Sequence, residues 1–200
     1  MKKIKINRND FSLEDIERVA NSINSGEVVV LPTDTIYGLS CLADSKKSVE
    51  RIYRIKKRSK EKPMIVLVKS FCMLRKYCFL SKRQYQYLKD EMNKNNPITV
   101  ILKKRKSTLK KLPQTGNSIA IRIPTGSKLL MAILKKINRP IVSTSLNFSG
   151  EVEIKNLKKL ENYFKKTTPD LIVDGGVLLR KKASKVVDIR DIEKIEILRE

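Results

Sequence analysis

Histidine is missing from this sequence altogether. Its absence excludes the Ser-His-Asp and Cys-His catalytic triads, the H-E-x-x-H zinc site and all imidazole acid–base catalysis. A reaction carried out by this chain must therefore depend on positioning, on charge, on hydroxyl groups, or on a metal ion that the substrate brings with it.

Cysteine is scarce, and long apolar runs are absent. Cys41, Cys72 and Cys78 are an odd number without a C-x-x-C pair, which favours reduced and mostly buried thiols over disulfides or a zinc site. No apolar run approaches the roughly 18 residues that a membrane span requires. The basic N-terminus is not followed by the apolar stretch of a signal peptide. We therefore expect a cytoplasmic protein that does not enter a membrane.

Acidic residues are few beside the basic ones, because 21 Asp and Glu face 44 Lys and Arg and the formal net charge is +23. Codon usage in an AT-rich genome would explain this excess, since Lys far outnumbers Arg and both Asn and Ile are abundant. A phosphate-bearing partner, either a nucleotide or RNA, would explain it equally. The two explanations are compatible, and the sequence leaves both open.

The pattern of apolar and polar residues predicts the fold class. With 40% hydrophobic residues, the chain suits one globular domain with a full core over residues 1–200. Strand patterns occupy residues 3–6, 27–31, 36–42, 64–68, 98–102, 119–123, 140–143, 171–173, 185–190 and 194–199. Helical patterns follow Ser12 and Ser45, fill 70–93 as two helices divided at Leu80-Ser81, and recur at 127–137 and 155–165. These elements do not alternate strictly as β-α-β. They predict an α/β fold around a twisted, mixed parallel and antiparallel sheet flanked by helices.

An interrupted strand pattern is the first candidate site. The apolar run that begins at Val28 breaks after Pro32 into Thr33-Asp34-Thr35 and resumes at Ile36. A strand that is only buried has no use for three small polar residues in its middle. These residues therefore either close a turn or hold a ligand.

A cluster of cations at residues 56–63 is the second candidate. Lys56, Arg58 and Lys62 fall where a helix unwinds into a loop that ends at Pro63. Cations suit the negative end of a helix dipole, so a solvated helix end would explain them. Beside a sheet edge, however, Arg as a planar fork and Lys as a point charge can bind a polyphosphate.

A polar strand exit is the third candidate. After Ile141-Val142, five hydroxyl or amide side chains follow within seven residues, namely Ser143, Thr144, Ser145, Asn147 and Ser149. Such residues are common where a strand leads into a turn. Their density favours a ligand, because loops after sheet strands are where open α/β folds bind ligands.

Two further basic features remain. Arg122 stands between Ile121 and Ile123, and a buried Arg needs a partner. That partner is either an internal carboxylate such as Asp174 or Asp188, or an anionic group of a substrate. Residues 103–111 contain six cations in nine positions, which is typical of a solvated loop and would be the place for phosphate contacts if RNA binds. The sequence contains neither a P-loop nor a G-x-G-x-x-G motif.

Taken in order, these segments resemble the threonylcarbamoyl-AMP synthases, the YrdC-like family. The resemblance runs from about Ser12 to Arg199. It rests on LPTDTIYGL (31–39), KKRSKEKP (56–63), SIAIRIP (118–124), STSLNFSG (143–150), DGG (174–176), ASKVVDI (183–189) and ILR (197–199). It implies the short, single-domain YrdC-like fold with a basic substrate cavity. It also implies a nucleotidyltransferase that joins L-threonine, bicarbonate and ATP into threonylcarbamoyl-AMP, the precursor of a tRNA modification.

The resemblance implies roles for particular residues. The expected threonine-binding residues are Thr35, Arg122, Ser143 and Ser184. The expected ATP-binding residues are Lys56, Arg58, Lys62, Ser118, Ser145, Asn147 and Arg199, with Lys56 and Arg58 stabilising charge during the reaction. No side chain is expected to act as a nucleophile, and Mg²⁺ is expected to arrive with ATP, without an organic cofactor. Proteins that transfer the threonylcarbamoyl group are expected partners, and direct binding of tRNA is left open.

Three positions depart from the family pattern. Leu146 and Phe148 stand where the family often has Ala and Leu, and Lys185 replaces a Thr that usually follows Ser184. These changes leave open a paralogue with a different acceptor. A second alternative is a module of the same fold that binds RNA or a nucleotide without turnover.

Overall fold

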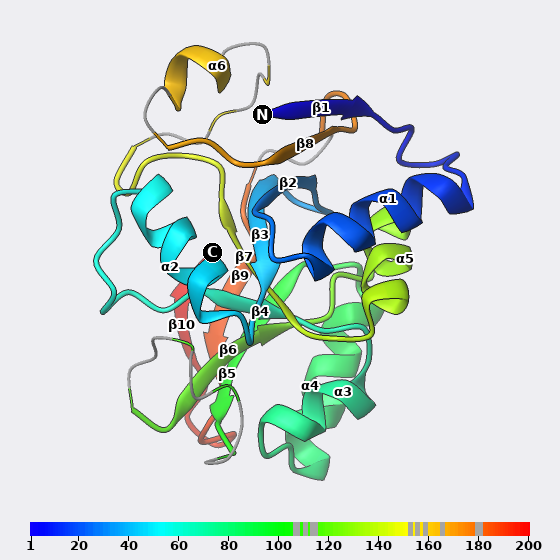
Figure 1. The fold of residues 1–200 in the computed structure, drawn as a ribbon. Coiled ribbons are helices and arrows are strands. Elements are labelled where there is room, and N and C mark those ends of the chain that lie inside the picture. Colours follow the sequence, from blue (N-terminus) through cyan, green and yellow to red (C-terminus); the bar gives the residue numbers. More distant parts are fainter. Residues whose placement is uncertain are drawn as a thin grey trace.

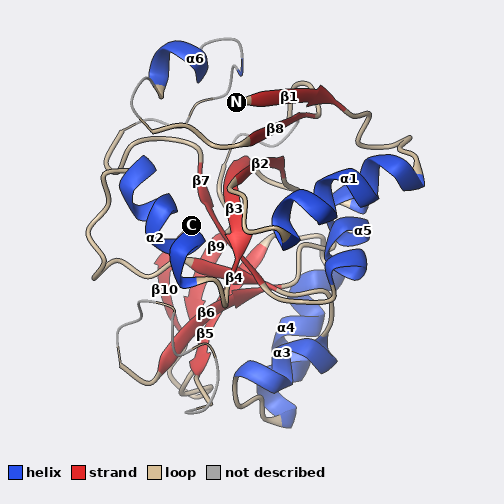
Figure 2. Ribbon diagram, viewed as in Figure 1, coloured by secondary structure: helices blue, strands red, loops and turns tan. Residues whose placement is uncertain are grey.

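One mixed sheet organises the molecule. The computed structural model describes residues 1–200 except 106–108, 110–111, 113–115, 152–153, 155–156, 158–159, 165–166 and 179–181. In the described part, ten strands follow the order β1-β8-β2-β3-β7-β4-β6-β5-β9-β10. The strands are β1 (Lys2–Lys5), β2 (Val29–Pro32), β3 (Tyr37–Leu42), β4 (Ile65–Leu67), β5 (Ile98–Lys103), β6 (Ser118–Arg122), β7 (Ile141–Ser145), β8 (Leu171–Asp174), β9 (Lys185–Asp188) and β10 (Glu196–Arg199). Figures 1 and 2 show how strongly the sheet twists between β1 and β10.

The pairing of the strands confirms a mixed sheet. Antiparallel neighbours are β2 with β3, β3 with β7, β7 with β4, β6 with β5, and β9 with β10. Parallel neighbours are β1 with β8, β8 with β2, β4 with β6, and β5 with β9. The predicted α/β class with a mixed, twisted sheet is therefore correct.

The helices begin where serine can cap them. They are α1 (Leu13–Asn24), α2 (Lys46–Ile55), α3 (Phe71–Tyr77), α4 (Lys82–Asn93), α5 (Lys128–Ile137) and α6 (Leu160–Tyr163). A serine hydroxyl accepts a hydrogen bond from a first-turn backbone N–H at the start of α1 through α5, which satisfies one of the donors that a helix start leaves open. The division of residues 70–93 at Ser81 is confirmed. Part of the helix expected at 155–165 lies outside the described residues.

Two apolar clusters cover the two faces of the sheet, because successive strand residues point to opposite sides. Along β2, Val30 belongs to one cluster while Val29 and Leu31 belong to the other. Helices α1 and α5 pack together over the second cluster, side by side in Figure 1. Helices α2, α3 and α4 contribute to the first cluster.

The remaining general predictions concern membranes and thiols. None of the helices formed by the described residues is long and apolar enough to cross a bilayer. All three cysteines are free; Cys41 and Cys78 are buried, whereas Cys72 is exposed. Burial raises the pKa of the Cys78 thiol to about 12, so this thiol stays protonated at neutral pH.

Candidate active site

A cavity of about 390 Å³ opens on one face of the sheet, across β3, β7, β4, β6, β5 and β9. Strand alternation builds it. Leu67 of β4, Arg122 of β6 and Val186 of β9 line the cavity, while their neighbours Val66, Ile121 and Val187 are fully buried in the core on the other face. The backbone pattern that makes the core therefore also aims a second set of side chains into the cavity.

The interruption after Pro32 forms one end of this cavity. The hydroxyl of Thr33 accepts hydrogen bonds from the backbone N–H groups of Thr35 (3.1 Å) and Ile36 (3.2 Å) and donates one to the Ile36 carbonyl (2.6 Å). Thr33 thus closes a tight turn between β2 and β3. Asp34 and Thr35 line the cavity beside it. Thr33 therefore closes a turn, and binding of a ligand by Asp34 and Thr35 stays a prediction.

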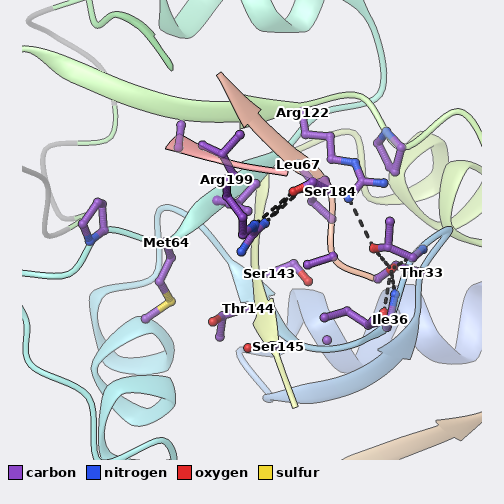
Figure 3. A pocket seen from close by; sticks show the side chains of 18 of the residues that line it. Thr33, Ile36, Met64, Leu67, Arg122, Ser143, Thr144, Ser145, Ser184 and Arg199 are labelled. Atoms are coloured by element: carbon purple, nitrogen blue, oxygen red, sulfur yellow. Dashed lines mark hydrogen bonds between the residues drawn. The ribbon is translucent and has the colours of Figure 1, made fainter. Parts of the chain in front are cut away.

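Arg122 forms the floor of the cavity, at the end of β6. Its Nη2 lies 2.5 Å from Oδ2 of Asp34, and both side chains are only 6% exposed. Its Nη1 donates a hydrogen bond to the Thr35 hydroxyl at 3.4 Å, a contact drawn in Figure 3. The internal carboxylate is therefore Asp34, which corrects the prediction of Asp174 or Asp188.

The two rejected carboxylates have cations of their own. Asp174 pairs with Lys3 at 3.0 Å, and Asp188 pairs with Arg190 at 2.7 Å. Asp174 ends β8 beside β1, which carries Lys3, and Asp188 ends β9 two residues before Arg190. Asp34 reaches Arg122 because the Thr33 turn places it there.

The polar exit of β7 forms a wall of the cavity. Ser143, Thr144 and Ser145 all line it, and the Ser40 hydroxyl donates a hydrogen bond to the Ser143 hydroxyl at 3.1 Å. Gly38 of β3 lies against this wall. A Cβ built at Gly38 would lie 2.4 Å from Oγ of Ser143, so only glycine leaves the Ser143 side chain in place.

Ser184 and Arg199 are joined by hydrogen bonds and form another part of the cavity lining. The Arg199 guanidinium donates to the Ser184 carbonyl from Nε (3.0 Å) and Nη2 (2.8 Å), and both residues line the cavity in Figure 3. The Ser184 hydroxyl lies 2.8 Å from the hydroxyl of Thr99 on β5. Thr99 is fully buried, so it holds Ser184 from behind.

The loop after α2 brings two cations to the mouth of the cavity. Arg58 and Lys62 both line it. The Arg58 guanidinium also donates to the carbonyls of Lys62 (3.3 Å) and Pro63 (3.1 Å), which folds the loop onto itself. Burial lowers the pKa of the Arg58 guanidinium, although an arginine in a protein keeps its proton.

Three predicted ATP-binding residues, Lys56, Asn147 and Ser118, are not among the described residues that line the cavity. Lys56 is 1% exposed, and its ammonium donates to the carbonyl of Asn147 (2.8 Å), to Asn147 Oδ1 (2.7 Å) and to the carbonyl of Ser145. Asn147 Oδ1 also accepts from the Ser145 hydroxyl at 2.7 Å. Ser118 is the first residue of β6, and the residues of this strand that line the cavity are Ala120 and Arg122.

Tyr37 ties the cavity to the DGG segment. Its hydroxyl donates to the Gly176 carbonyl at 2.6 Å and accepts from the Gly175 N–H at 3.0 Å. Burial raises the pKa of Tyr37 to about 12. The phenol therefore stays protonated at neutral pH and acts as a fixed strut.

The cavity is basic overall. Arg58, Lys62, Arg122 and Arg199 line it together with a single described carboxylate, Asp34. Its size falls in the lower range of small-molecule sites, and its charge favours an anionic ligand. Eight of the eleven predicted site residues meet here, namely Thr35, Arg58, Lys62, Arg122, Ser143, Ser145, Ser184 and Arg199.

Sequence reasoning missed Thr99 as a site residue, and it gave Asp34 no role beyond its place in the first candidate site. Asp34 stood inside the polar interruption, but no pattern linked it to Arg122. Thr99 lies in an apolar strand at residues 98–102. A lone hydroxyl in a mostly buried strand is a weak signal for a partner across the sheet.

Comparisons with known proteins show the family of the chain. The Sua5_yciO_yrdC family model, described as "Telomere recombination", matches residues 21–200. The threonylcarbamoyl-AMP synthase of Pseudoalteromonas translucida (strain TAC 125) is 31% identical over 140 residues, covering 70% of this chain and 74% of that protein. The human threonylcarbamoyl-AMP synthase is 27% identical over 163 residues, covering 82% of this chain and 56% of that protein. The chain thus spans little more than half the length of the human relative.

Solved structures share the fold. The crystal structure of E. coli YciO superposes with a TM-score of 0.86 at 27% identity, covering 100% of this chain and 96% of that one. The crystal structure of P. abyssi Sua5 complexed with L-threonine has a TM-score of 0.86 at 24% identity, covering 100% of this chain and 57% of that one. At 24% identity, the likeness to the P. abyssi structure shows the fold alone.

Proposed function

The chain belongs to the Sua5/YciO/YrdC family, and from this we propose that it catalyses the synthesis of threonylcarbamoyl-AMP from L-threonine, bicarbonate and ATP, with release of pyrophosphate. The product is the precursor for threonylcarbamoyladenosine next to the anticodon of tRNA. One observation carries the proposal: a single basic cavity holds an arginine floor, a ring of hydroxyls and a cationic mouth.

The floor suits the amino acid. Arg122 offers a guanidinium to the threonine carboxylate, since Arg pairs with carboxylates in a fixed geometry. Thr35, Ser143 and Ser184 surround it with hydroxyls that can hydrogen-bond the hydroxyl and main-chain groups of threonine. Glycine at position 38 keeps the Ser143 side chain aimed into this space.

The mouth suits the nucleotide. Arg58, Lys62 and Arg199 bring positive charge to the phosphates, and Ser145 adds a hydroxyl. Lys56 and Asn147 contribute from behind, because their hydrogen bonds hold the turn that carries Ser145. We therefore assign charge stabilisation at the phosphates to Arg58, Lys62 and Arg199, and support of the turn to Lys56 and Asn147.

The chemistry needs no nucleophilic side chain. The threonine amine, in its neutral form, reacts with bicarbonate to give an N-carboxylate and water, or with carbon dioxide to give the same N-carboxylate and a proton. One oxygen of this carboxylate attacks the α-phosphorus of ATP, the bond to the β-phosphate oxygen breaks, and pyrophosphate leaves. The protein aligns the groups and neutralises the charge that develops. This account fits a chain without histidine.

Magnesium has no binding site of its own among the described residues. The described residues contain no group of three or more Asp, Glu, Cys or His side chains that could hold a metal ion. We propose that Mg²⁺ arrives with ATP, coordinated mainly by phosphate oxygens and water.

The partners follow from the fate of the product. A mixed anhydride of a carbamic acid and AMP must be consumed by a protein that transfers the threonylcarbamoyl group to tRNA. The net charge of +23 supports direct binding of tRNA to this chain as well. Affinity for tRNA that falls steeply with rising salt would support such an interaction. If threonylcarbamoyl-AMP is still made when no tRNA is present, tRNA binding is not needed for the catalytic step.

Pyrophosphate release tests the proposed function. Release from ATP is measured with all substrates present, and then with threonine and bicarbonate left out in turn. The proposal expects release only in the complete mixture. Release that ignores threonine would instead indicate another nucleotidyl transfer, and absence of release with tight RNA binding would indicate a binding module.

A further inference from the structure

The buried pair of Asp34 and Arg122 contains a charge that the proposed function does not use. Arg122 has a role as the receptor of a carboxylate, but Asp34 occupies the same guanidinium at 2.5 Å. A carboxylate at this position opposes the binding of another carboxylate. If the cavity had only to attract an anion, Asp34 would weaken it.

Asp34 also has an oxygen with unused hydrogen-bonding capacity. Its Oδ1 is buried and accepts no hydrogen bond from the described residues, although an ionised carboxylate can accept about four. Buried oxygens of this kind are rare in folded proteins. On one side the carboxylate faces Gly126, where an added Cβ would lie 3.0 Å from the Asp34 Cβ, so that side brings no side-chain donor.

An α-amino acid carries the complementary pair of charges. Its carboxylate and its ammonium group are attached to the same carbon, so they lie a few ångströms apart, as do the two members of the pair on the cavity floor. A zwitterion can exchange one ion pair for two, with its carboxylate on the guanidinium and its ammonium on the Asp34 carboxylate. A plain carboxylate can satisfy only Arg122 and leaves Asp34 with a weakened partner in a buried site.

We propose that Asp34 determines specificity for a zwitterionic amino acid by accepting hydrogen bonds from the substrate's α-ammonium group while Arg122 binds its carboxylate. The proposal rests on the proposed function and names a chemical feature that the amino acid must have. Without a ligand, the two side chains neutralise each other and close the floor. The site therefore rejects carboxylates that have the size and hydroxyl of threonine but lack an amine.

A pair of ligands tests this directly. L-Threonine and 3-hydroxybutanoate differ only by the α-amino group, and isothermal titration calorimetry measures the binding of each to the full chain. For the unchanged protein we expect at least a 100-fold preference for threonine. Comparable affinities would overturn the proposal without any variant, so the test does not depend on the folding of a mutant.

The Asp34→Asn variant supplies the second arm. It keeps the shape of the side chain but removes its charge, so threonine should bind at least 10-fold more weakly. The binding of 3-hydroxybutanoate should become at least 10-fold tighter, because the guanidinium no longer has a competing carboxylate. A purely structural role would weaken both ligands together, and that result would overturn the proposal, as would an unchanged preference.

A matched control is available on the surface. Asp44 pairs with Arg139 at 2.6 Å, and both side chains are more than 40% exposed, so Asp44→Asn removes the same charge outside the cavity and should leave both affinities unchanged. The failure of this inference and the failure of the proposed function look different. If pyrophosphate release depends on threonine but threonine and 3-hydroxybutanoate bind equally well, only the inference is wrong. If pyrophosphate release does not depend on threonine, the proposed function is wrong.

Discussion

The ammonium of Lys56 lies 2.7 Å from Oδ1 of Asn147, a residue 91 positions later in the chain. This contact joins the end of α2 to the exit of β7, so the two segments that carry cations and hydroxyls are fixed relative to each other. The backbone supports the contact, because the Ser149 N–H donates to the Lys56 carbonyl at 2.8 Å.

Replacing Lys56 by Met should destabilise the protein. Met fills a similar volume but leaves the oxygens of Asn147 without their buried donor, and leaving a buried acceptor unsatisfied typically costs about 1–3 kcal/mol. Urea denaturation should therefore show a fall of that size in the free energy of unfolding. Lys57→Met is the control: Lys57 lies over the Phe148 ring at 4.7 Å, and losing that exposed contact should cost under about 1 kcal/mol. Equal stability of the two variants would contradict the role of Lys56.

Replacing Arg58 by Ala should reduce catalysis and spare the fold. Arg58 lines the cavity mouth, and among the described residues its guanidinium donates hydrogen bonds to carbonyls of its own loop, those of Lys62 and Pro63. Loss of a charge-stabilising donor typically lowers the rate about 10²–10³-fold. Steady-state pyrophosphate release measures this loss, and circular dichroism checks the fold. Arg54→Ala, on the exposed side of α2, should stay active. Near-normal release by folded Arg58→Ala would refute the assignment.

Replacing Thr99 by Val should weaken the binding of threonine and leave the binding of ATP nearly unchanged. Val has the shape of Thr but cannot hydrogen-bond, so the Ser184 hydroxyl loses its partner at 2.8 Å. A net hydrogen bond contributes about 1 kcal/mol, so we expect the KM for threonine to rise about 5- to 10-fold while the KM for ATP changes less than about twofold.

Thr99→Ser is the conservative partner of that variant. It keeps the hydroxyl at the buried position and should restore the KM for threonine. If both variants raise the KM for threonine equally, packing at position 99 matters and the hydrogen bond to Ser184 does not.

Replacing Gly38 by Ala should distort the serine wall. The new methyl group would lie 2.4 Å from Oγ of Ser143, so the Ser143 side chain or the strand must move. Overpacking of this kind typically costs about 1–3 kcal/mol, which thermal unfolding measures. We also expect weaker threonine binding than in the unchanged protein. A variant with full stability and full affinity would show that Ser143 can adopt another rotamer without consequence.

The sequence predicts most of the fold because its signals are local. The break after Pro32, the helix starts at Ser12 and Ser45, and the strand alternation each depend on a few residues. The helix over 155–165 is the weakest prediction, since α6 spans only Leu160–Tyr163 among the described residues. The cationic stretch at 103–111 lies partly outside the described residues and stays a prediction.

The site is predicted less completely because its decisive contacts are long-range. Arg122 was expected to need a partner, but the choice among carboxylates depends on the three-dimensional path of the Thr33 turn. Lys56 has the charge that a phosphate ligand needs, yet in the structure its ammonium is buried against the oxygens of Ser145 and Asn147. Spacing along a chain cannot distinguish a cation that faces a cavity from one that supports the cavity from behind.

Identification of the product tests the central claim most directly. The protein is incubated with L-threonine, Mg-ATP and ¹³C-labelled bicarbonate, and the mixture is analysed by mass spectrometry. The account predicts a species that contains threonine, AMP and one labelled carbon, formed in equal amount with pyrophosphate. Conversion of ATP only to ADP and phosphate, or an AMP-containing product without the labelled carbon, would contradict it.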